Sequence, residues 1–150
     1  MAHLDDLRPK TKKLCELWIE ECRKNGINLV VTQTFRSPEL QEAYYSQGRE
    51  NLESVNAKRK KVGLQVILET DNKIVTKAPA GSSPHNYGLA WDFAPIVNDK
   101  IDWNNLDLFK KCGEIAKLIN FEGYTLDWGG DFKNIKDLPH IQLKNWKKYK

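Results

Sequence analysis

Apolar side chains recur at helical spacing in two segments of the chain. The first segment starts at Thr11 and stops before Gly26, and the second starts at Leu106 and stops before Gly123. Spacing of three or four residues places apolar side chains on one face of a helix, so we predict an amphipathic helix in each segment. The residues that carry the two patterns are Leu14, Cys15, Trp18 and Cys22 in the first segment, and Leu106, Phe109, Ile115, Ala116 and Ile119 in the second.

Other segments have the composition of strands. They are rich in β-branched and apolar residues or alternate between apolar and polar positions. Between two of them, Ser37 and Pro38 favour the N-cap and first position of a helix that ends near Gly48. The predicted strands are Ile27–Phe35, Leu89–Val97, Tyr124–Trp128 and His140–Leu143.

Residues 50–73 have a weaker pattern. Here Lys58–Lys61 is compatible with the end of a helix, Leu64–Leu68 with a strand, and Asp71-Asn72 with a turn before a second short strand, Ile74-Val75. Helices and strands are interspersed along the chain without a regular βαβ repeat. No glycine-rich phosphate loop follows a strand, so we predict an α+β fold rather than a doubly wound sheet.

The composition is that of a folded domain. A chain of 150 residues with 40% hydrophobic and 29% charged residues matches one soluble globular domain. No apolar run reaches the roughly 18 residues that a membrane span requires. The first residues contain no apolar core of a secretory signal, so we expect the chain to be made in the cytoplasm without a signal peptide.

Charge and cysteine content indicate which surfaces and which cysteine states the sequence favours. The net charge of +4 comes partly from Lys58–Lys61 and from the tail Lys144–Lys150. Such runs favour solvated faces, with contact to an anionic surface as the alternative. The three cysteines form no CxxC pair, which favours buried free thiols over a disulfide or a metal site.

Two of the three histidines stand near aspartates in the second half of the chain. His85 and Asp92 are seven residues apart. A continuous strand would place them on opposite faces, because side chains alternate. They converge only if the chain turns between them, and Gly88 tolerates the positive φ that such a turn needs. Asp92 stands among apolar residues, where an ionised carboxylate is costly to bury unless a cation pairs with it.

A second cluster joins Asp137 to His140. Pro139 fixes its own φ and keeps the preceding residue extended, so we predict a rigid elbow that leads into a strand. Two imidazole nitrogens and one carboxylate oxygen suit Zn²⁺ and leave a fourth position for water, whose pKa zinc lowers to about 7. Spacing alone leaves the alternatives open, namely that His140 caps a strand and that Asp92 hydrogen-bonds a backbone loop.

Several short blocks follow one another in a fixed order. They are Phe35-Arg36-Ser37, Gln41, Tyr45, Gln47-Gly48-Arg49, Ser83-x-His85-x-x-Gly88-x-Ala90-x-Asp92, Trp128-Gly129-Gly130-Asp131 and Asp137-x-Pro139-His140. In this order the sequence resembles the D-alanyl-D-alanine carboxypeptidase-like zinc peptidases over about residues 14–143. It is most similar to their L-alanyl-D-glutamate endopeptidase branch, found in bacteriophage endolysins and bacterial wall hydrolases.

The resemblance implies a role for each matching residue. It implies an antiparallel sheet flanked by helices, with one zinc ion held by His85, Asp92 and His140. It further implies that Asp137 is the general base and that Arg36 stabilises the oxyanion of the substrate. Without the resemblance, a salt bridge is the simpler role for Arg36. Gln41 and Ser83 then contact the substrate or support these groups, although the Ser83 hydroxyl can also serve its own loop.

The resemblance also implies the extent of the domain. We expect residues 1–150 to form one zinc peptidase domain with an insertion at about 50–73 and no separate wall-binding domain. The insertion distinguishes the chain from close relatives and bears on peptide specificity more than on the zinc chemistry.

The implied function is hydrolysis of peptidoglycan stem peptides between L-alanine and D-glutamate. The alternatives are a D,D-carboxypeptidase or dipeptidase that acts on D-alanyl-D-alanine ends, and a non-catalytic zinc-binding or wall-binding module. We expect a monomer that acts at the bacterial wall after release through a holin-type membrane lesion. No basic motif interleaved with aromatic residues supports nucleic-acid binding.

Overall fold

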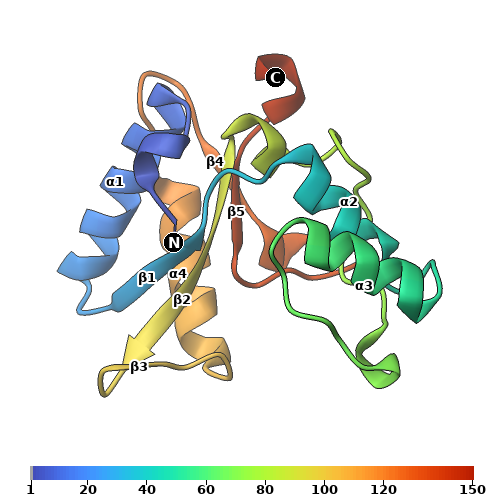
Figure 1. The fold of residues 1–150 in the computed structure, drawn as a ribbon. Helices are drawn as coiled ribbons and strands as arrows, with labels where there is room; N and C mark the ends of the chain where they lie inside the picture. The colour runs from blue at the N-terminus through green and yellow to red at the C-terminus, as the bar shows by residue number, and fades with distance from the viewer. Residues whose placement is uncertain (1) are drawn as a thin grey trace. The chain divides into compact units, whose positions relative to one another are not determined.

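The computed structural model describes residues 2–150, which form four α-helices and five strands (Figure 1). Within these residues, no helix has the length and apolar character needed to cross a membrane. The helices are α1 (Pro9–Lys24), α2 (Pro38–Ser46), α3 (Leu52–Lys61) and α4 (Leu106–Leu118). The strands are β1 (Asn28–Gln33), β2 (Ala90–Val97), β3 (Lys100–Ile101), β4 (Leu126–Trp128) and β5 (His140–Leu143).

The chain divides into two compact units. The first contains the residues up to Phe35 together with Tyr87–Lys150, and the second contains Arg36–Asn86. All five strands, α1 and α4 belong to the first unit, whereas α2 and α3 belong to the second. The single catalytic domain expected for residues 1–150 stays a prediction.

The first unit is built on an antiparallel sheet, as the fold class predicted. Its strands lie in the order β1-β2-β5-β4, and β3 pairs with the end of β2. In the register between β2 and β5, Asp92 lies opposite His140 and Ala90 lies opposite Gln142. On the other side of β5, Asp127 of β4 also lies opposite Gln142. This register brings polar residues from three strands into adjacent positions.

Aromatic packing decides which face of the sheet is covered. The Trp18 ring of α1 lies 4.9 Å from the Phe93 ring of β2, and the Phe93 ring lies 5.4 Å from that of Phe109 in α4. These side chains are buried in one hydrophobic core, so α1 and α4 cover this face. Because side chains alternate along a strand, Asp92 and His140 point to the opposite face.

The second unit contains two helices packed around Ala43 and Val55, both fully buried. The predicted start of α2 is confirmed, because the Ser37 hydroxyl accepts a hydrogen bond from the Leu40 N–H at 3.1 Å. The basic run Lys58–Lys61 closes α3, as predicted.

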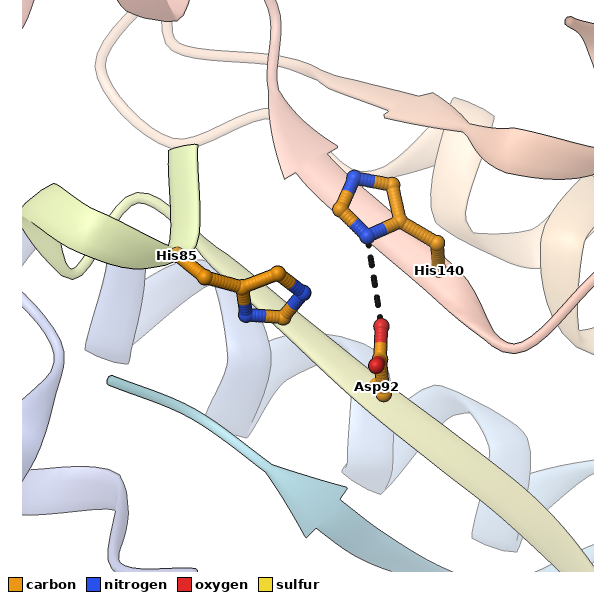
Figure 2. Close-up of side chains that lie close together, drawn as sticks. All are labelled: His85, Asp92 and His140. Atoms are coloured by element: carbon orange, nitrogen blue, oxygen red, sulfur yellow. Dashed lines mark hydrogen bonds and ion pairs between the residues drawn. The ribbon is translucent and has the colours of Figure 1, made fainter. Parts of the chain in front are cut away.

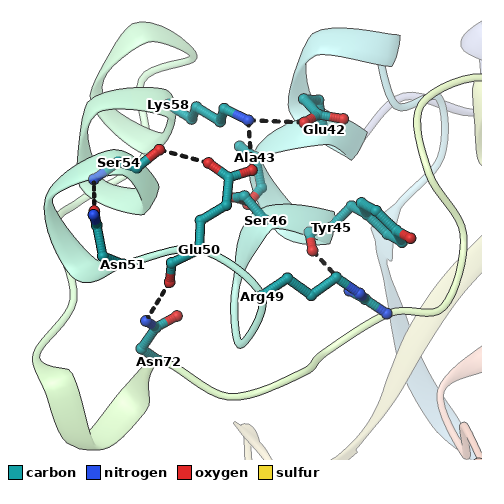
Figure 3. A network of polar contacts seen from close by, with 10 residues as sticks. All are labelled: Glu42, Ala43, Tyr45, Ser46, Arg49, Glu50, Asn51, Ser54, Lys58 and Asn72. Carbon is teal, nitrogen blue, oxygen red and sulfur yellow. Dashed lines mark hydrogen bonds and ion pairs between the residues drawn. The ribbon is translucent and has the colours of Figure 1, made fainter.

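A polar network ties α3 to α2 (Figure 3). The Lys58 ammonium lies 2.8 Å from a Glu42 carboxylate oxygen and 2.7 Å from one of Glu50. Hydrogen bonds to these carboxylates raise the pKa of Lys58, and the same ammonium lowers the pKa of Glu50. At the end of the predicted insertion, the Asn72 side chain accepts from the Gly48 N–H at 2.7 Å and donates to the Glu50 carbonyl at 3.0 Å. The insertion is therefore closed at its base.

The strands predicted within and after the insertion were wrong. Leu64–Leu68 and Ile74-Val75 belong to no strand. In the first segment the Asn56 side chain takes the place of a strand partner, since its amide accepts from the Ile67 N–H at 2.9 Å and donates to the Ile67 carbonyl at 3.1 Å. A side chain thus satisfies the backbone groups that a sheet would pair. Tyr124 also lies outside β4, because it forms an isolated bridge with Phe121.

Candidate metal centre

A carboxylate and an imidazole face each other across two neighbouring strands. Asp92 of β2 and His140 of β5 are directly opposite in the register. The Asp92 Oδ1 atom lies 3.2 Å from the His140 Nδ1 atom. His140 is buried and Asp92 is half-buried, so both groups are largely withdrawn from water. The strand pairing explains this meeting, because directly opposite residues have Cβ atoms about 5 Å apart.

The surroundings of His140 favour positive charge. Burial acts to lower the pKa of this histidine, because the imidazolium loses its water. The hydrogen bond to Asp92 and the negative charges of Asp92 and Asp137 act in the opposite direction and raise the pKa above its ordinary value. A position that attracts a proton in this way also attracts a metal cation.

His85 reaches the start of β2 through the turn predicted from the sequence. It lies in a short 3₁₀-helix, Pro84–Tyr87, which is followed by Gly88 with a φ of +69°. A Cβ atom on Gly88 would also lie 2.9 Å from the Asp6 carbonyl oxygen. Only glycine fits this conformation and this space without strain. The reversal predicted between His85 and Asp92 is therefore confirmed.

Three side chains meet as potential metal ligands (Figure 2). His85, Asp92 and His140 each offer one ligand atom, and these atoms lie within 4.8 Å of one another. They form the one group of this kind among the residues that the structure describes. Two imidazole nitrogens and one carboxylate oxygen are a donor set that fits zinc and leaves a coordination position open.

The elbow before β5 contains Asp137, which precedes His140 by three residues and whose negative charge acts on the His140 ring. The His140 N–H donates to the Asp137 carbonyl at 3.1 Å, and the Asp137 N–H donates to the Gly129 carbonyl at 3.0 Å. The Trp128 indole donates to the Leu138 carbonyl at 2.9 Å. These bonds confirm the predicted elbow and leave Asp137 exposed.

The elbow also explains why position 129 is glycine. A Cβ atom there would lie 2.2 Å from the Asp137 carbonyl oxygen and 3.0 Å from the His140 Cβ atom. Any side chain would push the elbow and His140 away. The predicted strand Tyr124–Trp128 ends directly before Gly129, but the sequence pattern did not indicate this close approach.

Arg36 is tied to the loop of His85 through the backbone. The Arg36 N–H donates to the His85 carbonyl at 2.9 Å, and the Asn86 side chain donates to the Arg36 carbonyl at 2.8 Å. The guanidinium donates to the Gln41 carbonyl oxygen at 2.8 Å and lies 5.0 Å from the centre of the Tyr44 ring. The predicted arginine and the predicted histidine ligand are thus held together within the second unit.

Gln41 and Ser83 support these groups. Gln41 is fully buried, and its amide donates to the Ala78 carbonyl at 2.7 Å while its oxygen accepts from Arg36. The Ser83 hydroxyl accepts from the His85 N–H at 3.2 Å. Both contacts fit a supporting role, and contact with substrate stays a prediction for each.

The sequence interpretation missed Gln142. Its side chain oxygen lies 2.8 Å from the His140 Nε2 atom. The signal was present in the sequence, because residues two positions apart on a strand share one face. The predicted strand His140–Leu143 therefore already placed Gln142 beside His140.

Comparison with known proteins finds similarity to peptidases in both a family model and individual relatives. The model of a peptidase family described as D-alanyl-D-alanine carboxypeptidase matches residues 76–143. The peptidoglycan L-alanyl-D-glutamate endopeptidase CwlK of Bacillus subtilis is 35% identical over 147 residues, which cover 92% of this chain and 74% of that protein. The L-alanyl-D-glutamate peptidase of Listeria phage A118 is 26% identical over 99% of this chain but only 42% of its own length.

Solved structures share the fold at lower identity. The Serratia marcescens L-Ala D-Glu endopeptidase ChiX has a TM-score of 0.57 and 19% identity, with 97% of this chain and 86% of that chain covered. The vancomycin resistance D,D-pentapeptidase VanY, solved in complex with Zn(II), has a TM-score of 0.55 and 14% identity, with 95% of this chain and 76% of that chain covered. These likenesses confirm the predicted fold class.

Proposed function

The chain belongs to the D-alanyl-D-alanine carboxypeptidase family of peptidases, and from this premise we propose that it is a zinc-dependent peptidoglycan hydrolase. The bond that we propose it cleaves joins L-alanine to D-glutamate in the stem peptides of the cell wall. The observation that carries the proposal is the group of two imidazoles and one carboxylate in a chain 35% identical to an endopeptidase of that specificity.

The residues proposed to hold one zinc ion are His85, Asp92 and His140. Their donor atoms are close together and chemically suited to that ion. Zinc, when bound, makes water acidic near neutral pH and polarises a carbonyl group. Burial of the His140 imidazole and partial burial of the Asp92 carboxylate reduce the contact of these two side chains with bulk water.

Two further side chains complete the proposed mechanism. Asp137 accepts the proton of the attacking water and passes it to the leaving amine, which is the work of a general base that then becomes a general acid. Arg36 donates to the oxygen that becomes negative in the tetrahedral transition state. Its guanidinium is always charged and offers several N–H donors, one of which is already directed by Gln41.

A second candidate activity is removal of D-alanine from D-alanyl-D-alanine ends. The description of the matching family model favours it. Digestion of purified sacculi, followed by mass spectrometry of the soluble products, separates the two. We expect fragments with a newly exposed D-glutamate amine, and no product after treatment with a chelator. Free D-alanine as the main product would favour the carboxypeptidase, and undiminished digestion with chelator would contradict zinc dependence.

The place of action belongs to the same proposal. Relatives from phages and from Bacillus are named for peptidoglycan bonds, which supports action at the bacterial wall. We propose that the protein works there as a monomer after release through a holin-type membrane lesion. Gel filtration tests the monomeric state, and lysis of cells with and without an added membrane lesion tests the route.

Gln41→Leu tests how Arg36 is positioned. The substitution removes the acceptor of the Arg36 Nη1–H and the amide that holds Ala78. We expect kcat to fall roughly 10–150-fold, since a hydrogen bond to a charged group contributes about 1.5–3 kcal/mol and about 1.4 kcal/mol corresponds to a factor of ten, while KM changes little. The matched control is Gln47→Leu, because Gln47 is also buried in the second unit and accepts from a different arginine, Arg59, at 2.6 Å. Equal losses of kcat in both variants would reduce the role of Gln41 to folding alone.

A further inference from the structure

The imidazole of His140 has a distinct partner at each nitrogen. Its Nδ1 atom faces the Asp92 carboxylate at 3.2 Å, and its Nε2 atom faces the Gln142 side-chain oxygen at 2.8 Å. Both distances lie within hydrogen-bonding range, but a carboxylate only accepts, so Nδ1 bonds to Asp92 only while it carries a proton, and a metal ion at that nitrogen takes the place of this proton. The two ring nitrogens therefore play different parts, and the nitrogen on the Asp92 side is the one that faces the group of ligand atoms.

The chemistry of an amide oxygen fixes the state of Nε2. The Gln142 Oε1 atom can only accept a hydrogen bond, so the His140 Nε2 atom must carry the proton. A neutral imidazole holds one proton, and with that proton on Nε2 the lone pair is on Nδ1. The Gln142 contact thus favours the tautomer whose free lone pair points toward Asp92.

Gln142 is well placed to hold this direction. It lies two residues after His140 on β5, and both side chains share one face of the sheet. The strand is paired on both sides, with Gln142 opposite Ala90 of β2 and Asp127 of β4. A central strand cannot shift its register without breaking both pairings, so the Gln142 side chain keeps its place beside the ring.

We propose that Gln142 is a positioning residue of the metal centre, which holds the His140 ring and its tautomer so that Nδ1 is available to a divalent transition-metal ion such as zinc. The inference rests on the proposed function and deepens it. Hydrogen-bonded partners of this kind orient metal-ligating histidines and make them more basic, and their loss typically costs 10–100-fold in metal affinity.

The test is the zinc affinity of purified protein, measured by competition between the chain and a chromophoric chelator for ZnCl₂. We expect Gln142→Leu to weaken zinc binding by roughly 10–100-fold. Gln142→Asn is expected to weaken it as well, because the shorter side chain withdraws the acceptor from Nε2. Gln142→Glu keeps an acceptor at the same reach, so its zinc affinity should equal or exceed that of the unchanged protein.

Two measurements distinguish the positioning role of Gln142 from an effect on protein stability and from a failure of the proposed function. Thermal unfolding of the metal-free variants reports stability, and the comparison of Gln142→Asn with Gln142→Glu decides the matter if the leucine variant does not fold. Nitrogen NMR of the zinc-bound protein should show a proton on His140 Nε2. This proton should be retained in Gln142→Glu and should exchange rapidly with water in Gln142→Leu. Unchanged zinc affinity in Gln142→Leu, or an equal loss in Gln142→Glu, would overturn the positioning role. Failure of the unchanged protein to bind zinc would instead overturn the proposed function together with this inference.

Discussion

Asp137→Asn is expected to abolish turnover while the protein keeps its zinc and its fold. The variant has nearly the same shape but cannot accept a proton, and general acid–base catalysis typically contributes 10²–10⁴-fold to the rate. The Asp137 side chain is exposed and stands outside the group of three ligand atoms. The bonds of the elbow run through its backbone, at the N–H and the carbonyl, which asparagine retains. Release of soluble fragments from sacculi and zinc content by elemental assay are measured on the same preparation.

The matched control is Asp131→Asn. Asp131 is also an exposed aspartate of the first unit, and its carboxylate pairs with Lys117 at 2.9 Å. The same change of charge there should leave turnover within a factor of two or so, because exposed ion pairs contribute less than about 1 kcal/mol. Near-normal wall digestion by Asp137→Asn, or an equal loss in the control, would remove Asp137 from the role of base.

Strong periodicity was enough to predict the main elements of the fold. The helical pattern beginning at Thr11 and the apolar strand from Leu89 correspond to α1 and β2, since both bury side chains in the same core. Short elements were harder. The strand β3 follows a two-residue turn, Asn98-Asp99, in which both residues have positive φ. An Asn-Asp pair at the end of an apolar strand is a hairpin signal that the sequence interpretation did not use.

The incorrectly predicted strands show that a local sequence pattern does not specify the pairing partner of an extended segment. Leu64–Leu68 has the apolar character of a strand, but whether it pairs depends on a partner that only the tertiary structure supplies. Asn56, eleven residues from Ile67, supplies that partner through its side chain. An extended segment can therefore satisfy its backbone without a sheet.

Some features of the candidate site could also be predicted from local sequence, whereas others depend on the tertiary structure. The turn at Gly88 and the elbow at Pro139 follow from local backbone chemistry, so the sequence could predict both. The face-to-face position of Asp92 and His140 depends on the register between β2 and β5, which a sequence pattern does not specify. The resemblance to a peptidase family predicted the ligand set before that register was known.

Because the register between β2 and β5 places Asp92 opposite His140, we expect a large loss of zinc binding in Asp92→Asn. The amide keeps the shape of the carboxylate but removes the negative charge that faces the His140 Nδ1 atom. Zinc prefers the anionic oxygen of a carboxylate to the neutral oxygen of an amide, so the substitution weakens the ligand that Asp92 offers beside the buried His140 ring.

We expect Asp92→Asn to weaken zinc binding by more than the roughly 10–100-fold that loss of a hydrogen-bonded partner such as Gln142 costs, because a ligand atom is changed rather than its support. Digestion of sacculi should fall with zinc occupancy and recover in part as zinc is added in excess. The matched control is Asp127→Asn, which makes the same change on the same face of the sheet but on β4, the strand on the other side of β5, opposite Gln142. Zinc affinity measured by chelator competition should be unchanged in that control. Equal affinities in the two variants would mean that Asp92 acts only through the general charge of the sheet face and binds no metal.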